Sequence, residues 1–114
     1  MSLNRFFFDG HIGAKPDIRT TSNGARVANF SIANTESYKS GDDWKDITTW
    51  VRVQVWGEAS VKRIEKQADK GCYISILGKM VQRTWTGKDG VEHSTLEAVV
   101  NYKDGGQIID IRPK

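Results

Sequence analysis

The sequence has few of the residues that stabilise small disulfide-rich or zinc-binding domains. Cys72 is the single cysteine among 114 residues, so no internal disulfide can form. We expect it to be a small buried hydrophobic residue in a reducing compartment. His11 and His93 are the two histidines of the chain, and with one cysteine they give no zinc-ligand spacing. The sequence therefore excludes a disulfide scaffold and a zinc finger.

Long apolar runs are also missing. No segment approaches the roughly 20 residues of a membrane-spanning helix. The N-terminal apolar run is limited to residues 6–8, which is too short for a secretory signal. We therefore expect a cytoplasmic protein. Its 17 Lys and Arg against 14 Asp and Glu give a net charge of +3, a mild excess that permits an anionic partner without requiring one.

Alternating apolar and polar residues predict β-strands over most of the chain. The expected strands span residues 5–12, 25–34, 48–58, 72–85, 94–101 and 107–111. Residues 58–71 instead have a helical period, with Val61 and Ile64 on one face. Ser60 is the expected N-cap of this helix and Gly71 the residue that stops it.

The order of these elements predicts the fold class. Residues 36–48 are polar, charged and glycine-containing, and we interpret them as a long loop or flexible hairpin. Gly78, in the middle of a long predicted strand, indicates a bend where a sheet curls. We predict an all-β protein with one helix: an OB-fold, a five-stranded Greek-key barrel with the helix between strands 3 and 4. At this length a single domain over residues 1–114 is expected.

Two predicted strands carry a second face that does not suit a core. Residues 51, 53 and 55 are valines and form one face of the strand 48–58. The opposite face places an arginine and a glutamine between two tryptophans: Trp50, Arg52, Gln54 and Trp56. One face of the strand 72–85 has a similar composition: Lys79, Val81, Arg83 and Trp85. An arginine in a core is unfavourable, so these faces are predicted to be functional.

Exposed aromatic rings beside cations are typical of a platform for single-stranded nucleic acid. Bases stack on the rings without being read for sequence, and Lys and Arg neutralise the phosphates. A duplex hides its bases and offers nothing to stack on. Two alternatives stay open: the tryptophans are structural, or the face is buried at a protein interface, where Trp, Tyr and Arg are also enriched.

The chain resembles the bacterial-type single-stranded DNA-binding proteins, the SSB family, over nearly its whole length. The resemblance rests on "VANFSIA", "TESY", "TTWVRVQVWGE", "YISILGKM", "RTW" and "TLEAVVN". It implies an OB-fold that wraps single-stranded DNA, with stacking by the residues at the family's four aromatic positions: Tyr38, Trp50, Trp56 and Trp85. Phosphate contacts are expected from three basic residues of the sheet and three of the loops: Arg52, Lys79, Arg83, Lys39, Lys45 and Lys88.

The expected function is sequence-independent binding of single-stranded DNA in replication, recombination or repair, with no catalysis, metal or cofactor. The acidic residues of the predicted loops, such as Asp42 and Asp43, are interpreted as solvated. The alternative is an SSB-derived accessory or primosomal protein that acts mainly as a protein-interaction module. A sugar-binding OB domain is a more distant alternative, and the Lys and Arg beside the aromatics argue against it.

The resemblance also bears on partners. Phe7 lies on the face of the first predicted strand that need not be core, and the family pairs subunits along this strand. A homo-oligomer is therefore expected, with a tetramer favoured and a dimer possible. Cellular members of the family continue into an acidic tip that recruits replication and repair enzymes, whereas this sequence ends at "RPK". Such tail-dependent partners are not expected.

Overall fold

The alternating segments form strands in the computed structural model, which describes residues 2–114. The elements in chain order are β1 (Phe6–Ile12), β2 (Asp17–Thr20), β3 (Arg26–Ser40), β4 (Asp43–Trp56), α1 (Glu58–Gln67), β5 (Tyr73–Thr86), β6 (Glu92–Asn101), the 3-10 turn η1 (Tyr102–Asp104) and β7 (Gln107–Arg112). No helix among the described residues is long and apolar enough to cross a membrane.

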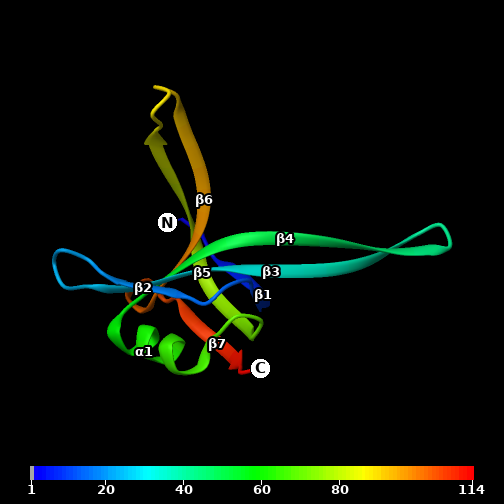
Figure 1. The fold of residues 1–114 in the computed structure, drawn as a ribbon, viewed down its shortest axis with the longest axis horizontal. Coiled ribbons are helices and arrows are strands. Elements are labelled where there is room, and N and C mark those ends of the chain that lie inside the picture. Colours follow the sequence, from blue (N-terminus) through cyan, green and yellow to red (C-terminus); the bar gives the residue numbers. More distant parts are fainter. Residues whose placement is uncertain (1) are drawn as a thin grey trace.

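The sheet closes on itself as a barrel. Its strands follow the order β1-β3-β4-β6-β5, and β1 pairs with β5 as well as with β3. The short β2 adds to β3, and β7 adds to β5. Helix α1 lies between β4 and β5 in the chain and packs below the barrel (Figure 1). The prediction of an OB-fold barrel with one helix after its third barrel strand is confirmed.

The core lies inside the barrel and against α1. Val53 and Val55 of β4 are fully buried, as the alternation predicts, and so are Ile74 and Ile76 of β5. The helix contributes a buried apolar stripe that includes Val61. Burying each such side chain contributes roughly 1.5–3 kcal/mol. This gain keeps the apolar positions of each strand inside the barrel, and the alternate positions therefore face outward.

Helix α1 begins and ends at other residues than predicted. It follows Gly57, whose φ of 109° is a conformation that favours glycine, and it has no side-chain cap. Ser60 therefore lies inside the first turn, and its prediction as the N-cap is wrong. The helix ends at Gln67, and Ala68 follows as the C-cap, with its N–H donating to the carbonyl of Ile64 at 2.9 Å. Gly71 lies beyond this end, in the turn that leads to β5.

The segment 36–48 is a regular hairpin rather than a loop. β3 and β4 stay paired out to Ser40 and Asp43, and the hairpin projects from the barrel as a long arm (Figure 1). Both faces of this arm stand in solvent, so most of its residues are polar and the sequence has no apolar alternation there. We call it the β3–β4 arm. A second projection, the β5–β6 arm, rises from another side of the barrel (Figure 1).

Gly78 marks the point where β5 changes partners. Residues 73–78 pair with β1, and pairing with β6 begins at Lys79. A Cβ at Gly78 would lie 2.7 Å from the backbone carbonyl oxygen of Val99. The glycine therefore permits the close approach of two backbones where the sheet curls, and this agrees with the bend predicted there.

Candidate nucleic-acid interface

Two hollows on the outer face of the barrel meet at Arg52. The first has a volume of about 350 Å³ and is lined by Gly13, Asn29 and Trp50, among others. The second has a volume of about 440 Å³ and is lined by the following residues: Arg52, Arg83, Trp85, Thr95 and Glu97. Because Arg52 lines both hollows, we treat them as one groove that runs from Trp50 to Trp85, and we call it the Trp50–Trp85 groove.

Trp50 stands at one end of this groove and is 59% exposed. The rest of the ring packs against the backbone of Gly13: a Cβ added there would lie 2.6 Å from the indole atom Cζ3. Gly13 thus holds the ring in place while leaving a face open to a ligand. Sequence reasoning missed this glycine, because it lies in an irregular segment with no periodic signal.

Trp85 stands at the other end, in the β5–β6 arm, and is 45% exposed. It lies directly across the strand pair from His93, and the two rings stack with centroids 5.5 Å apart and planes 24° apart. Nε2 of His93 lies 3.6 Å from a carboxylate oxygen of Asp89. One face of the indole is thus supported by the imidazole, which sequence reasoning also missed.

Between the two tryptophans, two arginines flank a buried carboxylate. Nε of Arg52 lies 3.9 Å from Oε1 of Glu97, and Nη1 of Arg83 lies 3.7 Å from Oε2. Glu97 is 7% exposed, whereas both guanidinium groups are open to solvent. A guanidinium has five N–H donors, so each arginine can face the carboxylate and keep donors free for an anion in the groove.

Glu97 was not predicted as a site residue. It lies in the run "TLEAVVN", which belongs to the predicted strand 94–101. Its neighbour Ala98 points into the core and is fully buried, so the Glu97 side chain points to the outer face. Strand alternation could have identified Glu97, because residue 97 faces the opposite side from the buried apolar residues Ala98 and Val100 of the same strand.

Trp56 is less available than predicted. It shares the outer face of β4 with Trp50 but is half-buried, and its Nε1–H donates to Oε1 of Gln54 at 3.2 Å. It lines neither hollow of the groove. The structure therefore brings Trp50 and Trp85 together in one groove and leaves Trp56 farther along the strand.

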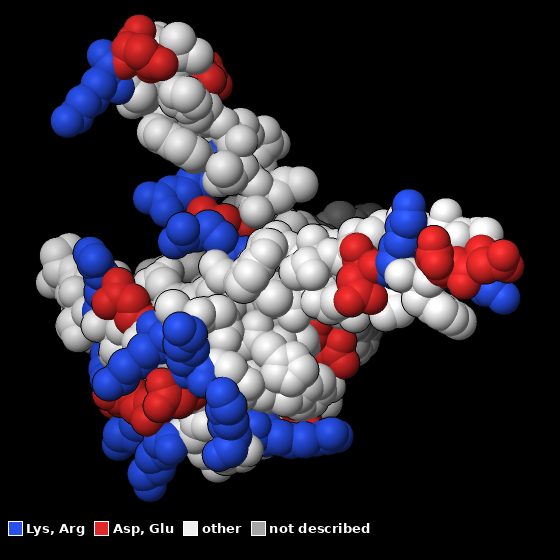
Figure 2. Space-filling view, turned by 45° about the vertical axis from the view of Figure 1, so that its right-hand side comes forward, with Lys and Arg blue, Asp and Glu red and all other residues white. Residues whose placement is uncertain are grey.

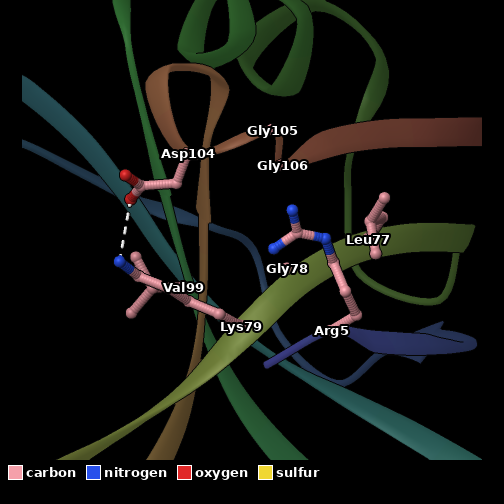
Figure 3. Close-up of a pocket in the computed structure, with 8 residues that line it drawn as sticks. All are labelled: Arg5, Leu77, Gly78, Lys79, Val99, Asp104, Gly105 and Gly106. Atoms are coloured by element: carbon pink, nitrogen blue, oxygen red, sulfur yellow. Dashed lines mark ion pairs between the residues drawn. The ribbon is translucent and has the colours of Figure 1, made fainter. Parts of the chain in front are cut away.

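Lys79 also lies apart from the groove. Its ammonium group pairs with a carboxylate oxygen of Asp104 at 3.0 Å, beside a small pocket that contains Arg5 and Gly106 (Figure 3). Lysine and carboxylate point toward each other, and both line this pocket (Figure 3). Of the three sheet cations predicted to meet phosphate, the structure brings the two arginines together and engages the lysine elsewhere.

The remaining predicted cations lie on the two arms. Lys39 and Lys45 are exposed near the tip of the β3–β4 arm, and Lys88 is exposed in the turn that ends the β5–β6 arm. Figure 2 shows positive side chains at the foot of the upright arm and over the lower body of the barrel, with mixed charge toward both arm tips. Exposed rings and cations therefore lie together in the Trp50–Trp85 groove.

Tyr38 lies on the opposite face of the β3–β4 arm from Trp50. Residues directly across a strand pair share a face, and Tyr38 lies opposite Lys45, whereas Trp50 lies opposite Ala33. Tyr38 is exposed but points away from the groove side of the ribbon. The four predicted stacking residues therefore do not form one row.

Within residues 2–114, the two shifted pKa values belong to groups outside the groove. A hydrogen bond from the Tyr73 hydroxyl to Asp9, 2.8 Å long, raises the pKa of Tyr73 above its ordinary value, and desolvation adds to this. A hydrogen bond to Glu65 raises the pKa of Arg26. Among residues 2–114 no group of three or more His, Cys, Asp or Glu is placed to hold a metal ion.

Comparison with known proteins agrees with this geometry. Residues 3–104 match the sequence profile of the "Single-strand binding protein family". The chain is 36% identical over 101 residues to a "Single-stranded DNA-binding protein" of Rickettsia felis, and 35% identical to that of Rickettsia conorii. In each case 87% of this chain is covered and 66% of the relative, so the chain spans just under two thirds of the length of these relatives.

The fold has a close counterpart among solved structures. The structure described as "Plasmodium falciparum SSB complex with ssDNA" superposes with a TM-score of 0.85 at 28% identity, and covers 96% of this chain and 97% of that one. The match extends over the barrel and both arms, because it includes almost every residue. Profile, sequence and fold agree, and the chain belongs to the single-strand binding protein family.

Proposed function

We propose that this protein binds single-stranded DNA without reading its sequence, and that it does so without catalysis. The observation that carries the proposal is the Trp50–Trp85 groove, which has an exposed indole at each end and two arginines between them. The proposal is supported by the names of the relatives, which are single-stranded DNA-binding proteins, and by the Plasmodium falciparum structure, which is described as a complex with ssDNA.

The tryptophans and the arginines of the groove bind different parts of the DNA strand. Bases stack on Trp50 and Trp85, which gives about 1–3 kcal/mol per base and does not depend on sequence. Arg52 and Arg83 bind the phosphates between the stacked bases and release counterions. Glu97 lies beneath them and partly neutralises both guanidinium groups. A duplex is excluded because its bases are already stacked on one another.

The other predicted site residues act at the margins of this groove. Tyr38 and Trp56 are secondary stacking positions, one on the far face of the arm and one half-buried at the end of β4. Lys39, Lys45 and Lys88 are exposed on the arms, where they can meet the strand as it leaves the groove. Lys79 contributes less, because Asp104 already pairs with it.

In the cell we place this activity in the cytoplasm, at the nucleoid. There it protects single strands that open during replication, recombination or repair. We further propose a homo-oligomer, with a tetramer favoured over a dimer. Phe7 supports this, since it is an exposed aromatic side chain on the outer face of β1. Light scattering behind a sizing column should give a multiple of the chain mass, and a monomer at micromolar concentration would contradict the assembly.

Binding competition tests the function directly. Fluorescence anisotropy with labelled oligo-dT should show saturable binding that unlabelled single strands of any base displace. Duplex of equal length should compete poorly. Trp50→Ala and Trp85→Ala should each weaken binding, whereas Tyr102→Ala, which alters an exposed aromatic outside the groove, should not. If duplex competes as well as single strand, the protein is not a single-strand binder.

A further inference from the structure

The β5–β6 arm places a titratable ring against one of the two indoles of the groove. The imidazole of His93 stacks on Trp85 with ring centroids 5.5 Å apart, and His93 lines neither hollow of the Trp50–Trp85 groove. The imidazole therefore packs behind the indole, as seen from the groove. Histidine is the side chain that ordinarily gains or loses its charge between pH 5 and 8. The ring that supports Trp85 can thus change its charge, whereas Trp50 packs against the uncharged Gly13.

The turn at the end of the arm holds a carboxylate beside this imidazole. Oδ1 of Asp89 accepts the backbone N–H of Val91 at 3.0 Å and lies 3.6 Å from Nε2 of His93. Gly87 leaves room for both groups, because a Cβ there would lie 2.8 Å from the same Oδ1 and 2.9 Å from Nε2. The turn backbone therefore fixes the carboxylate in position to pair with a protonated imidazole.

The surroundings of His93 come from the arm itself. Over residues 92–97, β6 is paired with β5 and with no other described strand. The imidazole is 43% exposed and so exchanges protons with solvent, and within the described part of the chain its ion-pair partner is Asp89. The remaining charged groups of this part of the arm lie in the turn, on the opposite face of β6, or toward the foot of the arm: Lys88, Glu92, Arg83 and Glu97.

Protonation of His93 adds a positive charge directly behind the indole. A cation within about 6 Å of an indole is attracted to the negative face of the ring, and the carboxylate of Asp89 attracts it as well. The charge therefore stays beside Trp85. A strand that stacks a base on the open face of Trp85 carries phosphates on both sides of that base. Within a Debye length of roughly 8 Å, salt screens the attraction between such charges only in part.

We propose that His93 is a positioning residue of Trp85 that makes the binding of single-stranded DNA depend on pH. The neutral imidazole supports the indole and adds no charge, whereas the imidazolium supports it and also attracts the phosphates of the bound strand. Binding therefore tightens as the pH falls through the titration of His93. By linkage, the bound strand favours the uptake of a proton. This inference rests on the proposed function and adds its regulation by protons.

A pH series of oligo-dT affinity tests the inference, because thymine and the phosphodiester do not titrate between about pH 5.5 and 7.5. Acidification over this range should lower the Kd of the unmodified protein about two- to fivefold, the equivalent of one exposed ion pair. The slope of log K against log salt should steepen by up to about 0.7. His93→Phe keeps a ring against Trp85, so it should bind as the unmodified protein does at the higher pH but lose this pH dependence.

His11→Gln is the matched control. His11 is the other histidine of the chain and contacts Tyr73 edge-on, outside the groove, so this variant should keep the pH dependence. Asp89→Asn should shift the tightening to lower pH, because it removes the charge that favours the imidazolium. A protonated imidazole quenches a stacked indole, so the tryptophan emission of the DNA-free protein should also fall on acidification. His93→Phe should remove most of that fall.

The outcomes separate this inference from the function on which it rests. A Kd that stays constant over this pH range, or that rises on acidification, would overturn the inference and leave the proposed function intact. A pH dependence that persists in His93→Phe, or that disappears in His11→Gln, would overturn it as well. If the unmodified protein binds no oligo-dT at either end of the range, the proposed function itself fails.

Discussion

Arg52 and Trp50 should stabilise the DNA complex by different interactions, one with phosphate and one with a base. They nevertheless lie two residues apart on one face of β4. A guanidinium that binds phosphate releases condensed counterions, so its contribution depends on salt. A stacked indole releases none of consequence. Arg52→Ala and Trp50→Ala therefore perturb the same groove in ways that a salt series separates.

The expected magnitudes follow from the geometry of the groove. Arg52 makes no closer ion pair than 3.9 Å to Glu97 and is open to solvent, so it is free to take one phosphate. Each such contact contributes about −0.7 to the slope of log K against log salt on single strands. Arg52→Ala should make the slope shallower by most of this amount, so its effect should shrink about fivefold over a tenfold rise in salt. Trp50→Ala should weaken binding by roughly 1–3 kcal/mol at every salt concentration.

The assay is oligo-dT affinity at four or five salt concentrations. Arg83→Ala should behave as Arg52→Ala does, because both arginines flank the same carboxylate. Lys79→Ala is the matched control: its ammonium group pairs with Asp104 outside the groove, so its slope should stay close to that of the unmodified protein. If Trp50→Ala flattens the slope as much as Arg52→Ala, or if neither changes affinity, this face does not bind DNA and the buried-interface alternative takes over.

Three further predictions concern residues that support the site or the fold. Glu97→Gln removes the charge that partly neutralises both arginines, so it should tighten oligo-dT binding at low salt and steepen the salt slope; an unchanged slope would contradict this. Gly13→Ala should displace the Trp50 ring, because the new Cβ would lie 2.6 Å from it, and should weaken binding as Trp50→Ala does while calorimetry shows a folded protein. The raised pKa of Tyr73 reflects its hydrogen bond to Asp9. The neutral Tyr73 hydroxyl stabilises the folded state through this hydrogen bond. Its contribution to the free energy of unfolding should be complete below the ordinary tyrosine pKa of about 10. It should be lost as the pH rises through the raised pKa of the folded state. Urea unfolding at neutral and alkaline pH should show this loss, and Tyr73→Phe should lack it.

The barrel could be predicted from the sequence because its strands have one buried face. Val53 and Val55 alternate with outward residues, and the same alternation recurs at Ile74 and Ile76. The β3–β4 arm could not be predicted as a regular hairpin, since both of its faces are in solvent and nothing selects apolar residues there. The start of α1 was missed because a glycine with positive φ, not a side-chain cap, begins it.

The site was predicted in part. Strand parity alone places Trp50 and Arg52 outside the core, and the structure joins them to Arg83 and Trp85 across β6. Strand parity gives the face on which a side chain lies but not its partner. The pairing of Lys79 with Asp104 could therefore not be predicted. Glu97 and Gly13 matter through contacts with residues distant in the chain, which a single sequence does not display.

The central claim is that bases stack on the open indoles of the Trp50–Trp85 groove, and tryptophan emission tests it most directly. Titration with oligo-dT should quench the emission strongly, and duplex of equal length should quench it weakly. The double variant Trp50→Phe/Trp85→Phe should still bind oligo-dT but show clearly weaker quenching than the unmodified protein. Unchanged emission at saturating oligo-dT, with binding seen by anisotropy, would contradict the stacking account.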